Sequence, residues 1–525
     1  MKLAIAQLNY TIGDFTSNKA KIINAINLAK ADGANLIAFA EFAISGSPAY
    51  DLLNRVNFLM LCEDTLAEIA QACDGIAAIV GLPIQQNCST LSAAAFIQNR
   101  KIVKFISRKL VNNRDDVAFI SSGSDDNSIV IDDRNFSIVL GDDILNPDQF
   151  LSAPTHSVIN IGASQYARQI IEKRYNFFGK LAFRIDSNIV FVNQVGANTD
   201  VIYDGSSAVF NHKGEPIALL DSFREDYRVI DLDDDNTPLE IPYQNKTKNV
   251  YNAIKLGLHD FFAKNGYTKA CLGLSGGIDS AVVAALAVEV LGPQNVKVLL
   301  MPSQFSSDHS VEDAVKMAEL LGVDYNIVPI SDIYKLIVSD MAPVFGENTD
   351  FGITEENIQA RIRGMLLMAL SNKFGHILLN TSNKSELALG WGTLYGDNTG
   401  MISILGDVYK SEVFDMARYI NRDSVIIPEN ILLKAPSAEL RPEQKDSDYL
   451  PPYDITDAII YRMIENGQSR EEVANAGFDA EVVGKIYRMI LQNEPKRRQL
   501  CPVLRVSTCP FRSSRIVPIT SKYGF

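Results

Sequence analysis

The chain has 525 residues, of which 47% are hydrophobic and 21% are charged, and its formal net charge is −14 at pH 7. This length exceeds what one ordinary core supports, and the acidic balance disfavours nucleic acid and anionic membranes as partners. No apolar run reaches the roughly 18 residues that a membrane helix needs. Six cysteines without paired metal spacing predict a reduced compartment and no zinc site. Composition therefore predicts a cytoplasmic globular protein of two or three domains.

Short apolar runs alternate with helical patterns in the first half of the chain. Residues 3–8 and 35–39 are predicted strands, and the helix between them is expected to bury one apolar face. Further buried strands are predicted at residues 76–81, 137–140, 157–161 and 188–192. Residues 231–238 form an acidic stretch closed by a proline, which is typical of a linker. We therefore expect domains of residues 1–235 and 236–525.

The most informative run follows a predicted helix at residues 249–265. An apolar strand ends in a loop of small residues, and a helix-compatible run begins directly after it. A strand that turns through glycines into a helix gathers backbone N–H groups at the positive end of a helix dipole, which suits a phosphate group. The loop lacks the Gly-Lys-Ser/Thr ending of Walker-type loops and instead resembles the pyrophosphate loop of enzymes that split ATP into AMP and pyrophosphate. Its residues are Gly273, Leu274, Ser275, Gly276, Gly277, Ile278, Asp279 and Ser280.

Strand–helix alternation continues through residues 296–301 and 377–379, which predicts a doubly wound parallel sheet with ligands at the carboxyl ends of its strands. Thr381 and Glu386 follow the second of these strands, where they suit contacts with adenine or ribose and with Mg²⁺ respectively. Asn357 and Arg361 are four residues apart on one helix face. By itself, that last pattern is more typical of a solvated helix face than of a ligand site.

Three further runs, residues 393–397, 406–411 and 434–442, follow in order. Taken together with the loop, the chain from about Asn249 onward resembles the synthetase domain of NAD⁺ synthetases, an ATP-pyrophosphatase fold. The resemblance implies amidation of nicotinic acid adenine dinucleotide by ammonia through an adenylate, with release of AMP and pyrophosphate. It also implies ATP as co-substrate, Mg²⁺ as cofactor and a homodimer or larger homo-oligomer.

The resemblance assigns roles to individual residues. It implies that the loop, Thr381, Lys410 and Ser437 bind ATP, and that Asp279 and Glu386 hold Mg²⁺. The implied catalytic residues are Asp279, Glu386 and Lys410. The implied contacts to the dinucleotide are Asn357, Arg361, Glu386 and Lys496, the last from a C-terminal tail.

The first half resembles the nitrilase-like amidase domain, an α-β-β-α sandwich that obtains ammonia from glutamine with a Glu base, a Lys and a Cys nucleophile. Glu41 and Lys109 match the Glu and the Lys, but Gly141 stands at the position of the cysteine. Residues 111–116 and 163–166 also depart from the family's pattern around its glutamine site. Since glycine offers no nucleophile, residues 1–235 are predicted to be an inactive amidase and the enzyme to use free ammonia.

Several alternatives remain open at this point. The chain is a glutamine-dependent NAD⁺ synthetase if it has an unrecognised nucleophile or receives ammonia from a partner protein. GMP synthetases, asparagine synthetases and tRNA thiolases share this type of loop. A non-enzymatic alternative is an adenylate-binding regulator. The inactive first half is expected to serve as an assembly scaffold or to dock an ammonia-producing protein.

Overall fold

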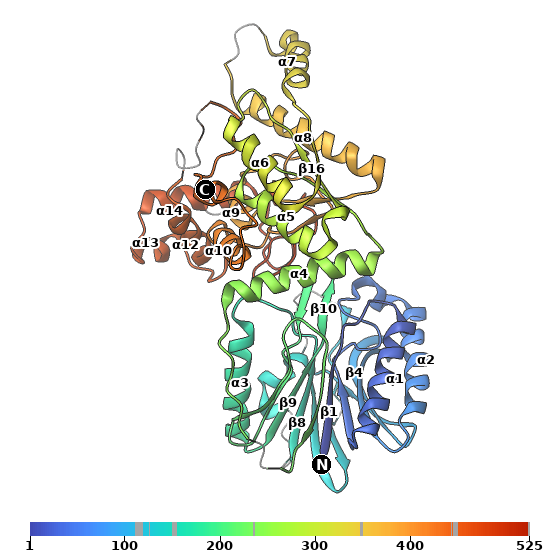
Figure 1. The fold of residues 1–525 in the computed structure, drawn as a ribbon. Helices are drawn as coiled ribbons and strands as arrows, with labels where there is room; N and C mark the ends of the chain where they lie inside the picture. The colour runs from blue at the N-terminus through green and yellow to red at the C-terminus, as the bar shows by residue number, and fades with distance from the viewer. Residues whose placement is uncertain are drawn as a thin grey trace. The chain divides into compact units, whose positions relative to one another are not determined.

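The computed structural model describes residues 1–110, 119–124, 126–149, 155–234, 237–346, 350–442, 444 and 450–522. The chain forms two compact units, Met1–Lys246 and Thr247–Phe525, each with its own core (Figure 1). The predicted domain boundary at residues 235–236 and the divergent segment 111–116 lie outside the described residues.

Two six-stranded sheets form the centre of the first unit. In spatial order, the first sheet consists of β14 (Asp226–Asp231), β1 (Lys2–Gln7), β2 (Leu36–Phe39), β3 (Ala77–Gln86), β4 (Ser89–Gln98) and β5 (Lys101–Ser107). The second consists of β13 (Pro216–Leu219), β12 (Ala208–Phe210), β9 (Asn188–Asn193), β8 (Ser157–Gly162), β7 (Arg134–Leu140) and β6 (Ser128–Ile131). A two-stranded ladder joins β10 (Val195–Asn198) and β11 (Val201–Asp204).

Alternation along β1 explains how the layers form. Leu3 and Ile5 lie in the core between the two sheets, whereas Ala4 and Ala6 lie in the core beneath the helices. The helices α1 (Phe15–Ala31) and α2 (Val56–Ala72) cover the first sheet, and α3 (Ile170–Ile185) packs on β9 and β12 of the second. Figure 1 shows α1 and α2 on one flank of this unit and α3 on the other. The predicted α-β-β-α sandwich is confirmed.

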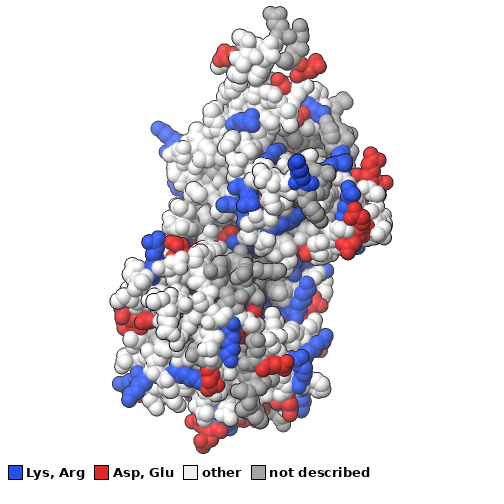
Figure 2. All heavy atoms as spheres, turned by 180° about the vertical axis from the view of Figure 1, so that it is seen from behind, with Lys and Arg blue, Asp and Glu red and all other residues white. Residues whose placement is uncertain are grey.

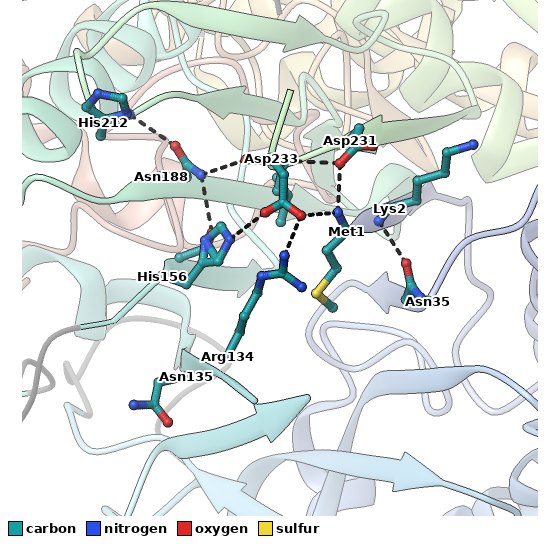
Figure 3. A network of polar contacts seen from close by, with 12 residues as sticks. Met1, Lys2, Asn35, Arg134, Asn135, His156, Asn188, His212, Asp231 and Asp233 are labelled. Atoms are coloured by element: carbon teal, nitrogen blue, oxygen red, sulfur yellow. Dashed lines mark hydrogen bonds and ion pairs between the residues drawn. The ribbon is translucent and has the colours of Figure 1, made fainter. Parts of the chain in front are cut away.

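Ionic contacts join the two sheets at one end of the sandwich (Figure 3). The Met1 amino group donates to Asp231 Oδ1 (2.8 Å) and to Asp233 Oδ2 (2.5 Å). Arg134, the first residue of β7, also donates to Asp233 Oδ2 (2.6 Å), and His156 Nε2 lies 3.0 Å from Asp233 Oδ1. The bond from the amino group holds the pKa of Asp231 below its usual value. Because the carboxylates are partly exposed, each pair contributes at most about 1 kcal/mol.

The second unit contains a five-stranded, fully parallel sheet. In spatial order its strands are β17 (Asp324–Ile327), β16 (Val296–Leu300), β15 (Ala270–Gly273), β18 (Ile377–Asn380) and β19 (Ile402–Ser403). The chain starts at β15, builds outward through β16 and β17, and returns to the other side of β15 as β18. The strand order therefore reverses between β15 and β18, the position at which doubly wound sheets bind ligands.

Helices cover both faces of this sheet, as a parallel sheet requires. On one face, Leu299 and Met301 share a core with Tyr334 of α7 (Ser331–Phe345) and Ile362 of α8 (Ile353–Phe374). On the other face, α5 (Ile278–Leu291) and α6 (Asp308–Leu321) pack on β16. Among the described residues, no helix combines the length and apolar character needed to cross a membrane. The helices are α4 (Lys246–Asn265), α5 (Ile278–Leu291), α6 (Asp308–Leu321), α7 (Ser331–Phe345), α8 (Ile353–Phe374), α9 (Lys384–Leu389), α10 (Lys410–Ile420), α11 (Glu429–Leu433), α12 (Tyr453–Ile464), α13 (Arg470–Asn475), α14 (Ala480–Gln492) and α15 (Glu494–Arg497).

Candidate active site

The predicted phosphate loop connects β15 to the N-terminus of α5. Gly276 has a φ of +77°, and a Cβ there would lie 2.3 Å from the carbonyl oxygen of Ser310, so only glycine fits. Two serines hold the turn. Ser280 Oγ donates to the Gly277 carbonyl (2.9 Å), and the Gly277 N–H donates to Ser275 Oγ (3.2 Å). The loop is thus fixed in the form that leaves the positive end of a 14-residue helix beside it.

Two carboxylates converge on one ammonium group next to this loop. Lys410 Nζ donates to Asp279 Oδ2 (2.5 Å) and to Glu386 Oε1 (3.3 Å). Asn383 Nδ2 donates to Asp279 Oδ1 (2.8 Å), and Asn383 caps the helix that carries Glu386. Asp279, Glu386 and Lys410 lie in the first turns of α5, α9 and α10 respectively. Three helix N-termini therefore meet where the strand order reverses, which favours anionic ligands.

These residues fit a magnesium ion held together with phosphates. Among the described residues, no group of three or more His, Cys, Asp or Glu side chains forms a metal cluster. Mg²⁺, however, is commonly held by one or two carboxylates together with substrate phosphates and water. Asp279 and Glu386 supply two carboxylates that already share one cation, the ammonium of Lys410.

The segment that carries Ser437 is anchored beside the loop. Ser437 Oγ donates to the Gln444 carbonyl (2.5 Å). Glu439 accepts hydrogen bonds from Ser310 Oγ (2.7 Å), at the start of α6, and from Lys434 Nζ (2.7 Å). Burial alone raises the pKa of Glu439, but the bonds from Lys434 and Ser310 outweigh it and hold the pKa below its usual value. Because the Ser310 carbonyl faces Gly276, this segment lies at the phosphate loop. Thr381 lies directly after β18, at the carboxyl end of the sheet.

The residues predicted to contact the dinucleotide meet at one loop, residues 390–397. Thr393 Oγ1 donates to Asn357 Oδ1 (2.7 Å), and Arg361 Nε donates to the Leu394 carbonyl (3.3 Å). Lys496 Nζ donates to the carbonyls of residues 390 and 392, at 2.6 and 2.9 Å. The Glu386 carbonyl accepts the Trp391 backbone N–H (2.9 Å) from the same loop. The structure therefore brings Asn357, Arg361, Glu386 and Lys496 to one region.

Two further ionisable groups lie in this region and were not singled out from the sequence. Burial raises the pKa of Asp397, which accepts a hydrogen bond from the Thr393 N–H (2.6 Å). Burial lowers the pKa of Arg363, whose Nε donates to the Met301 carbonyl (3.0 Å). No spacing rule distinguishes such residues from surface charges, because their burial depends on the packing of α8 against the sheet.

In the first unit, a buried ion pair occupies the predicted amidase site. Glu41 Oε1 accepts hydrogen bonds from Ser92 Oγ (2.6 Å) and from Arg108 Nη1 (3.3 Å). Arg108 Nη2 also lies 3.4 Å from Asp142 Oδ2. Burial raises the pKa of Glu41, an effect that Arg108 and Ser92 oppose. Arg108 thus supplies a cation beside Glu41, and the backbone N–H of the neighbouring Lys109 donates to Asp143 Oδ2 (2.7 Å).

Gly141 lies directly against this ion pair. It follows β7 with a φ of +50°, and a Cβ at this position would be 2.8 Å from Arg108 Cζ and 3.0 Å from Glu41 Oε2. The sequence position predicted for the lost nucleophile is therefore beside the predicted base. A side chain at position 141 would therefore require the guanidinium end of Arg108 to move.

The first unit has three cysteines, which differ in burial. Cys62 and Cys73 are buried in the core beneath the helices, and burial raises the pKa of each thiol to about 12. A thiol with such a pKa carries almost no thiolate at neutral pH. Cys88 is exposed in the turn before β4, four residues from Ser92, which corresponds to about 13 Å of extended chain.

Comparison with known proteins gives a family match in each of the two units. The NAD synthase family model matches residues 250–500, and the carbon-nitrogen hydrolase model matches residues 2–126. The glutamine-dependent NAD(+) synthetase of Synechocystis sp. is 38% identical to this chain over 99% of both chains. That of Thermotoga maritima is 35% identical over 100% of this chain and 99% of its own. The chain belongs to the family of two-domain NAD⁺ synthetases.

A solved NAD⁺ synthetase structure supports the same fold. The glutamine-dependent NAD⁺ synthetase of Acinetobacter baumannii, in complex with ADP, superimposes with a TM-score of 0.80 at 34% identity, covering 99% of this chain and 98% of that one. The family and fold predicted from the sequence are confirmed, and the chain is a ligase of the NAD⁺ synthetase type. These relatives are named for glutamine, which does not support the prediction of a strictly ammonia-dependent enzyme.

Two residues that hold the acidic side chains of these sites, Asn383 and Arg108, were not predicted from the sequence. Asn383 joins Asp279 to α9, and its spacing to Glu386 is that of an Asx capping box, a signal that is visible in the sequence. Arg108 adjoins Lys109, and two neighbouring cations cannot be ranked from sequence alone.

Proposed function

We propose that this chain joins nicotinic acid adenine dinucleotide to ammonia at the expense of ATP, forming NAD⁺, AMP and pyrophosphate. The observation that carries the proposal is the convergence of Asp279 and Glu386 on Lys410 at the phosphate loop. Negative charge develops on the α-phosphate and on the leaving pyrophosphate, and donors fixed in advance stabilise such charge best.

The residues of the second unit divide this work. The loop from Gly273 to Ser280, the N-terminus of α5 and Lys410 bind the phosphates, with Thr381 and Ser437 as further contacts to ATP. Asp279 and Glu386 hold Mg²⁺, which when bound supplies charge neutralisation at the phosphates. Asn357, Arg361, Glu386 and Lys496 orient the dinucleotide around residues 390–397. Its carboxylate then attacks the α-phosphorus, and ammonia displaces AMP from the mixed anhydride.

The amidase-like unit supports ammonia as the nitrogen source that the enzyme takes up directly. Gly141 carries no nucleophile, Arg108 fills the adjoining space, and the carboxylate of Glu41 is already ion-paired. Thioester formation with glutamine requires a thiolate and a free base at this point. On this proposal residues 1–235 are an inactive amidase, and residues 236–525, with the C-terminal tail, are the synthetase.

The names of the relatives favour a second candidate, a glutamine-dependent enzyme. That activity needs either ammonia from a partner protein or a different nucleophile. Ser92, whose hydroxyl donates to Glu41, is the described side chain best placed for the latter role.

Steady-state turnover with two nitrogen sources tests both candidates. Purified protein with ATP, Mg²⁺ and nicotinic acid adenine dinucleotide is supplied with ammonium or with glutamine in ammonia-free buffer, and NAD⁺ is followed. We expect turnover with ammonium alone. Equal turnover with glutamine that Ser92→Ala abolishes favours the second candidate, and ATP binding without turnover favours a regulator.

The surface charge is consistent with small-molecule substrates. On the face drawn in Figure 2, acidic and basic side chains are interspersed among uncharged ones, which suits small-molecule substrates more than nucleic acid.

We also propose that the protein forms a homodimer or a larger homo-oligomer. Light scattering after size-exclusion chromatography measures the mass of the assembly.

A further inference from the structure

The helix that carries Glu386 is too short to hold its own position. α9 has six residues, and isolated helices below about 12 residues are marginal in water. Its carboxylate nevertheless lies 3.3 Å from Lys410 Nζ, and its N-cap, Asn383, contacts Asp279. Contacts with other elements must therefore fix α9. Figure 1 shows α9 among α12 and α14, in the orange and red part of the chain.

A buried ion cluster fixes the first turn of α9. Lys384 is fully buried, and its Nζ lies 2.8 Å from Asp407 Oδ1, 2.5 Å from Glu465 Oε1 and 2.8 Å from Ser507 Oγ. Asp407 Oδ2 also accepts the N–H groups of Val506 and Ser507, both at 2.7 Å. The cluster thus ties the start of α9 to the C-terminal segment. A buried charge of this kind is tolerated because it is paired and hydrogen-bonded.

Side chains from the same C-terminal segment fix the other end of α9. Arg497 Nη1 donates to the carbonyls of Ala388 (2.9 Å) and Leu387 (3.3 Å). Asn493 Nδ2 donates to the Leu389 carbonyl (2.9 Å). These are the last carbonyls of the helix, which have no partner within it. Lys496 holds the two glycine carbonyls that follow, so the segment from Asn493 to Ser507 grips both ends of α9.

We propose that Lys384 and Arg497 are positioning residues that hold α9 so that Glu386 faces Asp279 and Lys410. The inference rests on the proposed role of Glu386. The contacts described for both side chains are with buried groups around α9, and none of those partners is the side chain of Asp279, Glu386 or Lys410. Since a shift of about 1 Å at a reacting group reduces the rate by about 10²-fold, loosening α9 lowers kcat rather than ATP binding, which depends mainly on the loop.

The substitution Arg497→Met tests this proposal with a matched control. Glu494 keeps its bond from Arg498 Nε (3.0 Å), so the change strands no carboxylate, and Arg498→Met at the neighbouring, exposed position is the control. For Arg497→Met we expect kcat to fall by about 10²-fold and the Mg²⁺ concentration for half-maximal rate to rise, with KM for ATP within about threefold. Arg497→Lys should recover part of kcat. Unchanged kcat and Mg²⁺ dependence in folded Arg497→Met would overturn the proposal.

Trp391 gives a readout that does not depend on turnover. It is the single tryptophan of the chain, and its backbone N–H donates to the Glu386 carbonyl (2.9 Å), so its position follows that of α9. We expect Arg497→Met to change its fluorescence and Arg498→Met to leave it unchanged; unchanged emission in Arg497→Met also contradicts the proposal. If the wild type makes no NAD⁺ but the emission changes, the proposed function fails while the grip on α9 stands. Should Arg497→Met not fold, Ser507→Ala, which removes one partner of Lys384, takes its place with the same expected readouts.

Discussion

Each unit of this protein contains a cation held between carboxylates, and the two arrangements have opposite consequences. In the first unit, Arg108 lies between Glu41 and Asp142 and fills the space beside Gly141. In the second, Lys410 lies between Asp279 and Glu386, at three helix N-termini beside a phosphate loop. On the function proposed above, an ion pair closes the first site and prepares the second. What differs between them is the surrounding backbone and the space around the pair.

The largest expected effect comes from removing the ammonium of the second site. Lys410→Met should lower kcat/KM by about 10³-fold, because a fixed cation at the developing phosphate charge is lost. Without ATP, the same variant should bind Mg²⁺ more tightly, since no ammonium competes for Asp279 and Glu386. Isothermal titration measures this binding. Lys297→Met, which removes a surface pair with Asp324, is the control, and weaker Mg²⁺ binding in Lys410→Met would contradict the expectation.

Removing the cation of the first site should affect stability and leave the chemistry intact. Arg108→Met leaves Glu41 buried without its ion pair, which costs about 3–5 kcal/mol of unfolding free energy in such pairs. Denaturant unfolding measures the loss, and adding Glu41→Gln should recover part of it. The ammonium-dependent kcat of the folded fraction should not change. A large fall in kcat would mean that the two sites are not independent.

The anchor of the Ser437 segment should depend on pH. The pKa of Glu439 is lowered in the folded state, so the stability it contributes is complete above its unfolded pKa and is lost as pH falls through the lower, folded pKa. Glu439→Gln should therefore cost about 2 kcal/mol at neutral pH, and the difference from wild type should shrink below about pH 4.5. Unfolding at several pH values measures it. A difference that is constant down to pH 3 would show that charge is not responsible.

The smallest expected effect is on glutamine-dependent turnover when a thiol is placed at position 141, and it tests directly whether Arg108 blocks the first site. Gly141→Cys introduces a thiol beside Glu41 but should yield no glutamine-dependent NAD⁺, because its Cβ would lie 2.8 Å from Cζ of Arg108, whose buried guanidinium is held by Glu41 and Asp142. Gly141→Cys combined with Arg108→Ser removes that obstruction and serves as the matched comparison. Glutamine-dependent turnover of the single variant would show that the space is not closed.

The sequence predicted most of the fold because its signals are local. Buried strands at residues 137–140 and 157–161 form β7 and β8, and residues 377–379 fall within β18. The turn at Gly276 follows from sterics that only glycine satisfies. The family follows from the order and spacing of such runs, and the relatives confirm it.

What the sequence left undecided depends on which side chains meet after folding. It predicted Lys109 as the cation of the amidase site, which stays a prediction, and it gave no sign that the neighbouring Arg108 contacts Glu41. It assigned Lys496 to the dinucleotide, and in the structure this ammonium holds two backbone carbonyls after α9.

The sequence by itself determined the sandwich, the glycine-rich turn from β15 into α5 and the glycine at position 141, since each follows from residue type and local spacing. Only the tertiary structure decided that Arg108 pairs with Glu41, that Asn383 links Asp279 to α9, and that the C-terminal segment holds both ends of α9. These contacts join residues up to about a hundred positions apart. Sequence spacing does not predict these contacts. A charge or a carbonyl that is removed from water is stable only when it is paired or hydrogen-bonded, and folding determines which group lies close enough to pair with it.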